Sequence, residues 1–175
     1  ISYRLQPEEI EYIVNDCGAK VLITSHLLTE TFNGFKDKLQ HHPRCFMVDG
    51  VVAGATSWEA AIADMPTSRI TDEAYGQSLL YSSGTTGRPK GVRKPLPEGV
   101  FGGESAVAAV ARQRYAYDEQ TVYLSPAPLY HAAPLGFNMN ILRYGGTSIV
   151  MEHYDAEHAL ALIEQYRITH SQWVP

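Results

Sequence analysis

The sequence of 175 residues has little cysteine, no excess of positive charge and no long apolar run. Cys17 and Cys45 form no C-x-x-C pair, so neither a disulfide framework nor a thiolate metal site is indicated. The formal net charge of −5 argues against nucleic-acid binding, which depends on clustered cations. No signal peptide opens the chain and no apolar segment is long enough to span a bilayer, so we expect no transmembrane segment.

The composition is that of an ordinary globular protein, with 45% hydrophobic and 19% charged residues. A cytoplasmic location is therefore the expectation, with peripheral attachment to a membrane left open. The length suffices for one domain or for two small lobes. The chain starts at Ile1, which is not an initiator methionine, and stops at Pro175 directly after a strand pattern. We therefore expect a piece of a larger protein.

Helix and strand patterns alternate along the first half of the chain. Pro7 and Gly18 suit the start and stop of a helix. The apolar face of this helix consists of Ile10, Ile13, Val14 and Cys17. The segments KVLITS and CFMVDG are typical of short buried strands. Thr56 and Glu59 match a capping box, which predicts a further helix.

A polar, turn-rich stretch near Asp72 divides the chain into lobes of residues 1–72 and 73–175, and the second lobe repeats the alternation. Strands are predicted at SLLYSS, TVYLSP, TSIVM and HSQWV, and helices at residues 104–114, 134–144 and 155–167. In the last helix Asp155 is the expected N-cap. Its predicted inward residues are Ala159, Leu160, Ile163 and Tyr166. Short strands alternating with helices predict the α/β class, with mostly parallel sheets covered by helices.

The segment YSSGTTGRPKGV joins a strand pattern to a loop rich in glycine and hydroxyl groups. It differs from the nucleotide-binding pattern G-x-x-x-x-G-K-S/T, because Pro89 stands where the second glycine belongs and Gly91 follows Lys90. Gly84 and Gly87 permit the close approach of backbone amides to a ligand. Together with four hydroxyls and the Lys90 ammonium, these amides suit a polyanion at the end of a strand. The alternative, a turn with solvated hydroxyls, fits this ordered combination less well.

The same segment resembles the signature loop of the adenylate-forming superfamily, which comprises acyl-CoA synthetases, luciferases and adenylation domains of peptide synthetases. Three further stretches resemble this family: ISYRLQPEEIEYIVNDCGAKVLITS, PAPLYHAAPLGFN and YDAEHALALIEQYRITHSQWVP. The likeness covers almost the whole chain. It implies part of the large N-terminal domain of an acyl-CoA synthetase, with the C-terminal domain absent from this sequence.

This resemblance implies a two-step reaction with ATP, Mg²⁺ and coenzyme A. A carboxylate attacks the α-phosphate of ATP to form an acyl-adenylate and pyrophosphate, and the coenzyme A thiol then displaces AMP. The loop residues expected to bind the nucleotide are Ser82, Ser83, Gly84, Thr85, Thr86, Gly87, Arg88, Pro89 and Lys90. Lys90 is the first predicted catalytic residue, because its charge would stabilise the departing pyrophosphate.

His131 is the second predicted catalytic residue, and it lies between Pro128 and Pro134 where a strand pattern ends. The resemblance places this histidine beside the substrate carboxylate. Its expected role is positioning and charge complementarity, because a carboxylate is already ionised at neutral pH and needs no base. The apolar residues Phe137 and Met139 are assigned to the core in preference to an acyl tunnel.

The later motifs of the family, which contact adenine, ribose and magnesium, lie outside this sequence. No metal ligand is therefore predicted here, and we expect this chain alone to be inactive. The leading hypothesis is part of an acyl-CoA synthetase that activates a carboxylic acid, with a fatty acid as the first choice. The alternatives are an amino-acid or aryl-acid adenylation domain and a non-catalytic module that binds ATP or an acyl-adenylate. Only small-molecule partners are expected, namely ATP, a carboxylic acid and coenzyme A.

Overall fold

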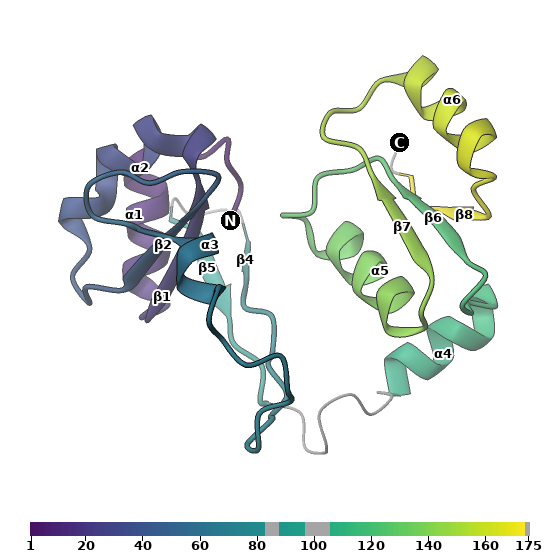
Figure 1. Cartoon of the computed structure of the whole chain (residues 1–175), viewed down its shortest axis with the longest axis horizontal. Coiled ribbons are helices and arrows are strands. Elements are labelled where there is room, and N and C mark those ends of the chain that lie inside the picture. Colours follow the sequence, from purple (N-terminus) through teal and green to yellow (C-terminus); the bar gives the residue numbers. More distant parts are fainter. Residues whose placement is uncertain (83–87, 97–105, 174–175) are drawn as a thin grey trace. The chain divides into compact units, whose positions relative to one another are not determined.

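The computed structural model describes residues 1–82, 88–96 and 106–173, and the chain forms two compact units (Figure 1). Unit 1 comprises residues 1–73 and 77–95, and unit 2 comprises residues 74–76 and 96–175. The sequence placed a boundary near Asp72 and assigned the glycine-rich loop to the second lobe, whereas the structure groups residues 77–95 with unit 1.

Unit 1 contains two separate sheets. Its elements are α1 (Pro7–Asp16), β1 (Val21–Ser25), η1 (His26–Leu28), α2 (Thr29–Phe35), η2 (Lys36–Lys38), β2 (Arg44–Val48), β3 (Thr56–Ser57), α3 (Trp58–Ile62), β4 (Leu80–Ser82) and β5 (Lys90–Val92). Strands β1, β2 and β3 form a parallel sheet in that order, in which Ile23 pairs with Phe46 and Met47 pairs with Ser57. Strands β4 and β5 form an antiparallel hairpin.

The core of unit 1 lies between the helices α1 and α2 and strand β2. Its buried residues are Ile10, Val14, Phe32, Phe35, Leu39 and Met47. Phe32 and Met47 have no exposed surface, and the Phe32 ring meets the Phe35 ring edge to face with centroids 5.7 Å apart. Burial of these large side chains supplies the main driving force for folding this unit.

Helix α1 starts and stops where its sequence predicts. Pro7 occupies the first turn, and Gly18 has a φ of 60°, the left-handed conformation that suits the residue after a helix. Ile13 is buried along with the other two predicted aliphatic residues of this face. The assignment of Cys17 to the same face is wrong: its side chain is exposed, because the helix ends at Asp16 and the chain turns away.

The predicted capping box before α3 has a different N-cap. The hydroxyl of Ser57, and not that of Thr56, accepts a hydrogen bond from the backbone N–H of Ala60. Thr56 belongs to the short strand β3, which pairs with β2. The carboxylate of Glu59 accepts hydrogen bonds from the backbone N–H of Asp49 and from the Ser57 hydroxyl, both at 2.9 Å.

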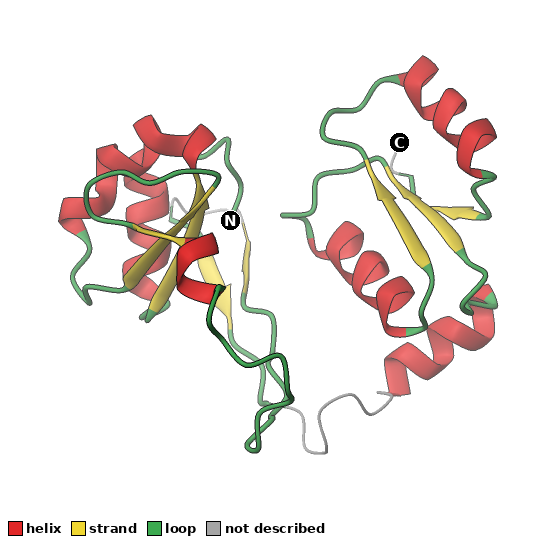
Figure 2. Ribbon diagram, viewed as in Figure 1, coloured by secondary structure: helices red, strands yellow, loops and turns green. Residues whose placement is uncertain are grey.

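Unit 2 is built around a second parallel sheet. Its elements are α4 (Ala106–Tyr115), β6 (Val122–Ser125), α5 (Ala132–Arg143), β7 (Thr147–Val150), α6 (Ala156–Tyr166) and β8 (His170–Ser171). Strand β6 is central, with β7 on one side and β8 on the other (Figure 2). Leu124 of β6 is paired with Ile149 of β7 and with Ser171 of β8. The predicted α/β class with mainly parallel sheets and helices is therefore confirmed.

Helix α6 confirms its predicted N-cap but presents a different inward face. The Asp155 carboxylate accepts a hydrogen bond from the backbone N–H of His158 at 2.7 Å. Ala159 is buried as predicted, whereas Leu160 is 67% exposed and Tyr166 is 43% exposed. Leu162 is buried instead. The apolar run ALALI offers more than one possible stripe, and packing against Leu124 and Met151 selects the one that contains Leu162.

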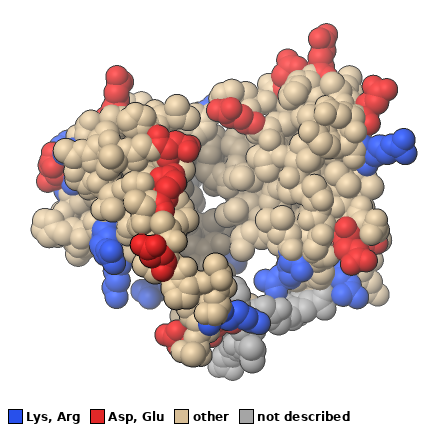
Figure 3. Space-filling view, in the orientation of Figure 1, with Lys and Arg blue, Asp and Glu red and all other residues tan. Residues whose placement is uncertain are grey.

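Charged side chains of both signs are spread over the visible face of each unit (Figure 3). Among the helices in the described part of the chain, none combines the length and apolar composition needed to cross a bilayer.

Candidate nucleotide-binding site

The β4 and β5 strands of unit 1, which pair as a hairpin, flank the predicted loop. Leu80 pairs with Val92, Tyr81 with Gly91, and Ser82 with Lys90. Of the predicted nucleotide-binding residues, Ser82 and Lys90 are therefore paired at the loop end of the hairpin, and Arg88 and Pro89 directly precede Lys90. The predictions for Ser83, Gly84, Thr85, Thr86 and Gly87 lie outside the described residues.

The hairpin has two faces with different roles. Side chains alternate between faces along a strand, and directly paired residues of an antiparallel hairpin share a face. Tyr81 reaches Asp16 of α1 with a hydroxyl-to-carboxylate distance of 2.6 Å, so its face of the hairpin is turned toward the helix. Ser82 and Lys90 belong to the other face, and both are exposed. One hydroxyl and one ammonium are thus available to an incoming anion.

Helix α1 also contacts the chain just before the second strand of the hairpin. The Tyr12 hydroxyl donates a hydrogen bond to the carbonyl of Pro89 over 3.1 Å. The Arg88 guanidinium lies over the Tyr12 ring, with its central carbon 5.2 Å from the ring centroid. The nucleotide-binding role of Arg88 remains a prediction, since its partner in this structure is an aromatic ring.

At this contact Tyr81 is half-buried and Asp16 is exposed. Desolvation is the largest cause that raises the pKa of the Tyr81 hydroxyl, and the neighbouring Asp16 carboxylate raises this pKa further. The phenol therefore stays protonated and can donate to the carboxylate throughout the physiological range. A Cβ at Gly91 would lie 2.9 Å from the Tyr81 ring, so the glycine of the P-K-G sequence leaves room for this aromatic side chain.

Tyr12, Asp16 and Tyr81 are site residues that sequence reasoning missed. Tyr12 and Asp16 lie four residues apart on a helix whose other face is apolar, so they could have been assigned to one surface of α1. Their contacts are made with residues 77 and 65 positions further along the chain. No local pattern connects segments at that separation.

The other predicted catalytic residue, His131, lies in unit 2. It is the N-cap residue of α5, which starts at Ala132, two residues before the predicted start. Its backbone N–H donates to the carbonyl of Pro128, and its own carbonyl accepts from the N–H of Leu135, both at 3.2 Å. The imidazole is exposed and lies 4.5 Å from the ring of Tyr130, measured between centroids. Lys90 and His131 belong to different units, so their meeting in one site remains a prediction.

A hydrogen-bond network centred on Asn138 holds helix α5. Asn138 of α5 donates hydrogen bonds to the hydroxyl of Ser125 and to the carbonyl of Pro134, both at 2.8 Å, and accepts one from the hydroxyl of Ser148. It therefore ties α5 to strands β6 and β7. Sequence reasoning also missed this residue, although an asparagine within an apolar helix stretch is a signal for a buried hydrogen-bond network.

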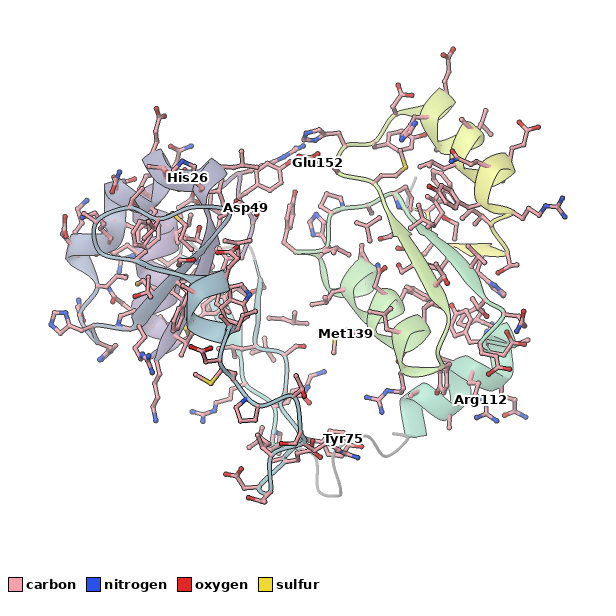
Figure 4. All side chains as sticks on the ribbon, in the orientation of Figure 1. His26, Asp49, Tyr75, Arg112, Met139 and Glu152 are labelled. Carbon is pink, nitrogen blue, oxygen red and sulfur yellow. The ribbon has the colours of Figure 1, made fainter. Side chains whose placement is uncertain are left out.

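The exposed side of α5 is apolar. Phe137 belongs to the core as predicted, stacked with Tyr123 at a centroid distance of 6.2 Å. The core assignment of Met139 is wrong: its side chain is 56% exposed (Figure 4). Leu135, at 36% exposure, and Met139 follow His131 at intervals of four residues, so the three lie along one side of the helix start.

Clusters of potential metal ligands were sought among the described residues. Across residues 1–82, 88–96 and 106–173, no three His, Cys, Asp or Glu side chains come together in a way that could hold a metal ion.

Comparison with known proteins gives consistent matches over the whole chain. A curated relative, 4-hydroxybutyrate–CoA ligase 2 from Metallosphaera sedula, is 28% identical over 182 residues, which cover 97% of this chain and 32% of the relative. The 4-coumarate–CoA ligase-like 3 protein from Oryza sativa subsp. japonica is 37% identical over 131 residues, which cover 74% of this chain and 21% of that protein. This chain thus spans about a third or less of the length of these relatives.

The fold also matches solved structures. The N-terminal domain of FACL13 from Mycobacterium tuberculosis has a TM-score of 0.77 at 24% identity, covering 100% of this chain and 42% of that one. The O-succinylbenzoate coenzyme A synthetase from Bacillus subtilis, solved with ATP and magnesium, has a TM-score of 0.65 at 24% identity. The match covers 95% of this chain and 32% of that one. At the sequence level, the model of the AMP-binding enzyme family matches residues 1–175. This chain therefore belongs to the AMP-binding enzyme family.

Proposed function

We propose that this chain is part of an ATP-dependent acid–CoA ligase that forms AMP, and that it supplies the phosphate-binding hairpin of that enzyme. The observation that carries the proposal is the pairing of Ser82 with Lys90 on the exposed face of an anchored hairpin. The names of curated relatives agree with this activity, because they include a 4-hydroxybutyrate–CoA ligase and a 2-succinylbenzoate–CoA ligase.

In the proposed first step, a substrate carboxylate oxygen attacks the α-phosphorus of ATP. The new bond gives an acyl-adenylate, and the bond to the β-phosphate oxygen breaks, so that pyrophosphate leaves with its electron pair. Lys90 and the hydroxyl of Ser82 would contact the β- and γ-phosphates, where negative charge accumulates as pyrophosphate departs. Mg²⁺, held mainly outside this chain, would screen the phosphate charges.

His131 is proposed to lie beside the carboxylate in that step. An exposed imidazole at the N-terminus of α5 can donate a hydrogen bond to a carboxylate oxygen, and the start of the helix adds partial positive charge. In the second step the thiol of coenzyme A attacks the carbonyl carbon of the acyl-adenylate. A thioester forms, and AMP leaves.

An apolar acyl group is the favoured substrate class. Leu135 and Met139 continue the side of α5 that starts at His131, and both are exposed apolar residues. Such a surface suits an alkyl or aryl chain better than the charged ammonium of an amino acid. A fatty acid is therefore our first choice. An aryl acid is the second, and the name of one relative, a 4-coumarate–CoA ligase-like protein, agrees with it. We propose a cytoplasmic setting for this reaction.

Exchange of labelled pyrophosphate into ATP tests the first step. The complete enzyme that contains this chain should catalyse exchange with fatty or aryl acids, whereas residues 1–175 alone should not. The His131→Ala variant should raise the KM for the carboxylic acid, with a smaller effect on the KM for ATP. Nucleotide binding without exchange, over a panel of fatty, aryl and amino acids, would favour a non-catalytic module instead.

A further inference from the structure

Helix α1 holds both strands of the phosphate-binding hairpin. Tyr12 and Asp16 are separated by one helical turn and lie on the same side of α1. Tyr12 donates its hydroxyl hydrogen bond to the carbonyl of Pro89, just before β5 begins. Asp16 accepts a hydrogen bond from Tyr81, in the middle of β4. One helix face therefore anchors the chain immediately before and after residues 83–87.

The anchoring helix is itself fixed in the core of unit 1. Ile10 and Val14 are 7% and 2% exposed, and they pack in one cluster with Phe32. These residues occupy the opposite side of α1 from the two anchors. Because the helix is packed into the core, the side chains on its other face are held in defined positions. Side chains on a loop are held less precisely.

The two anchors contact Pro89 and Tyr81, which are the chain neighbours of Lys90 and Ser82. The Arg88 guanidinium adds a contact to the Tyr12 ring, and Tyr81 lies across Gly91 on the face turned toward α1. Fixing these positions determines where Ser82 and Lys90 lie at the exposed face. Ligand-binding side chains whose backbone is fixed before binding lose less conformational entropy on binding.

We infer that Tyr12 and Asp16 are positioning residues for the triphosphate of ATP, because they pre-organise the hairpin that carries Lys90. This inference rests on the proposed function, in which the hairpin binds the β- and γ-phosphates. It adds a helix from the start of the chain to the nucleotide site. Loss of either anchor should weaken the binding of ATP and should leave the binding of the carboxylate and of coenzyme A unchanged.

The test uses the complete enzyme and substitutions that delete single hydroxyl or carboxylate groups. Tyr12→Phe and Tyr81→Phe each keep the ring and remove one hydrogen bond. We expect each to raise the KM for ATP in pyrophosphate exchange by about 2- to 10-fold, the range for one net hydrogen bond. The KM for the carboxylate should change by less than about twofold. The rate of thioester formation from a supplied acyl-adenylate should also stay within that factor, because that step does not use the triphosphate.

A double-mutant cycle isolates the anchor on β4. Asp16→Ala should raise the KM for ATP as Tyr81→Phe does. The double variant should be no worse than either single variant, because both remove the same hydrogen bond. Asp16→Asn retains an acceptor for Tyr81 and should stay close to the wild type. Glu8→Gln, which removes an exposed carboxylate from the same helix, is the matched control and should leave the KM for ATP unchanged.

The outcomes separate this inference from the proposed function. A wild-type enzyme without exchange activity toward any carboxylic acid overturns both. An active wild-type enzyme in which Tyr12→Phe and Tyr81→Phe keep the KM for ATP within twofold overturns the positioning role alone. Equal increases in the KM for ATP and for the carboxylate also overturn it, since they show general loosening of the protein. Urea unfolding of each variant verifies that the fold is retained.

Discussion

Asn138 and Ser125 join α5 to the central strand of unit 2 through a hydrogen bond of 2.8 Å between the amide nitrogen and the hydroxyl oxygen. Both residues are almost fully buried, with 5% and 1% exposure. The same amide group also accepts a hydrogen bond from Ser148 on β7. The network therefore fixes α5, whose N-cap is His131, against two parallel strands.

The first prediction concerns this network. Asn138→Ala would leave the buried hydroxyl of Ser125 and the half-buried hydroxyl of Ser148 without their amide partner, and each unsatisfied group is costly. We expect the free energy of unfolding to fall by about 2–4 kcal/mol for the two groups together. Urea unfolding of the chain, followed by circular dichroism, measures this change. Leu142→Ala, one turn further along α5 and 62% exposed, is the control and should change stability by less than about 0.5 kcal/mol. Equal effects of the two substitutions would rule out a stabilising network.

The second prediction concerns Gly91. An alanine Cβ there would lie 2.9 Å from the Tyr81 ring, closer than side chains normally approach. The ring must move, and its hydrogen bond to Asp16 would be lost with it. We expect Gly91→Ala to lower the free energy of unfolding by about 1–3 kcal/mol, as overpacking does elsewhere.

The control substitution for Gly91→Ala should change the free energy of unfolding in the opposite direction. Gly136 lies within α5, and a Cβ at that position would meet no atom within 4 Å. Gly136→Ala should therefore stabilise the chain by about 0.5–1 kcal/mol, because alanine loses less backbone entropy in a helix. Urea unfolding of both variants makes the comparison. A Gly91→Ala protein as stable as the wild type would mean that Tyr81 does not need the space.

The third prediction concerns the pH dependence of stability at Glu59. The hydrogen bond from the Asp49 backbone is the largest cause that lowers the pKa of this carboxyl, and the Ser57 hydroxyl lowers it further. Because the folded-state pKa lies below the unfolded value, the ionised carboxylate stabilises the fold above the usual glutamate pKa, about 4.3. That contribution is lost as the pH falls below this value and through the lower folded-state pKa.

Glu59→Gln tests this contribution directly. The wild type should be more stable than the variant at pH 7, and the difference should shrink as the pH is lowered from about 5 to 3. Urea midpoints at several pH values provide the measurement. Asp64→Asn, which neutralises an exposed carboxylate just after α3, serves as the comparison. A stability difference between wild type and Glu59→Gln that stayed constant from pH 7 to pH 3 would contradict the assignment.

The fourth prediction concerns Lys90. In the complete enzyme Lys90→Ala should slow acyl-adenylate formation by about 100-fold, the effect of removing one preorganised group that stabilises developing charge. Burst measurements of pyrophosphate release give this rate. Lys94→Ala, which removes another exposed lysine after the same hairpin, is the matched control. Equal losses in the two variants would assign the effect to overall charge and not to the site.

Much of the fold was predictable because it depends on local patterns. The alternation of short apolar segments with amphipathic ones predicted parallel sheets and helices, and Asp155 marked the start of α6 by its capping chemistry. The strand predicted at SLLYSS contains β4, whereas its antiparallel partner β5 was not predicted.

The remaining features depend on tertiary contacts. The pairing of Tyr12 with Pro89 joins residues 77 positions apart, and no spacing rule predicts it. Leu160 was assigned to the inward face of α6 because two apolar stripes are possible there, and only packing against β6 distinguishes them. Met139 was assigned to the core because apolar residues at helical spacing usually pack there, whereas it lies on the exposed side of α5.

The central claim is that the β4–β5 hairpin binds the phosphates of ATP. A crystal structure of the complete enzyme with a non-hydrolysable ATP analogue tests it most directly. We expect the Lys90 Nζ atom within about 3 Å of a β- or γ-phosphate oxygen, with Tyr12 still bonded to the Pro89 carbonyl. A bound nucleotide whose phosphates lie away from Lys90 and Ser82 would contradict the account.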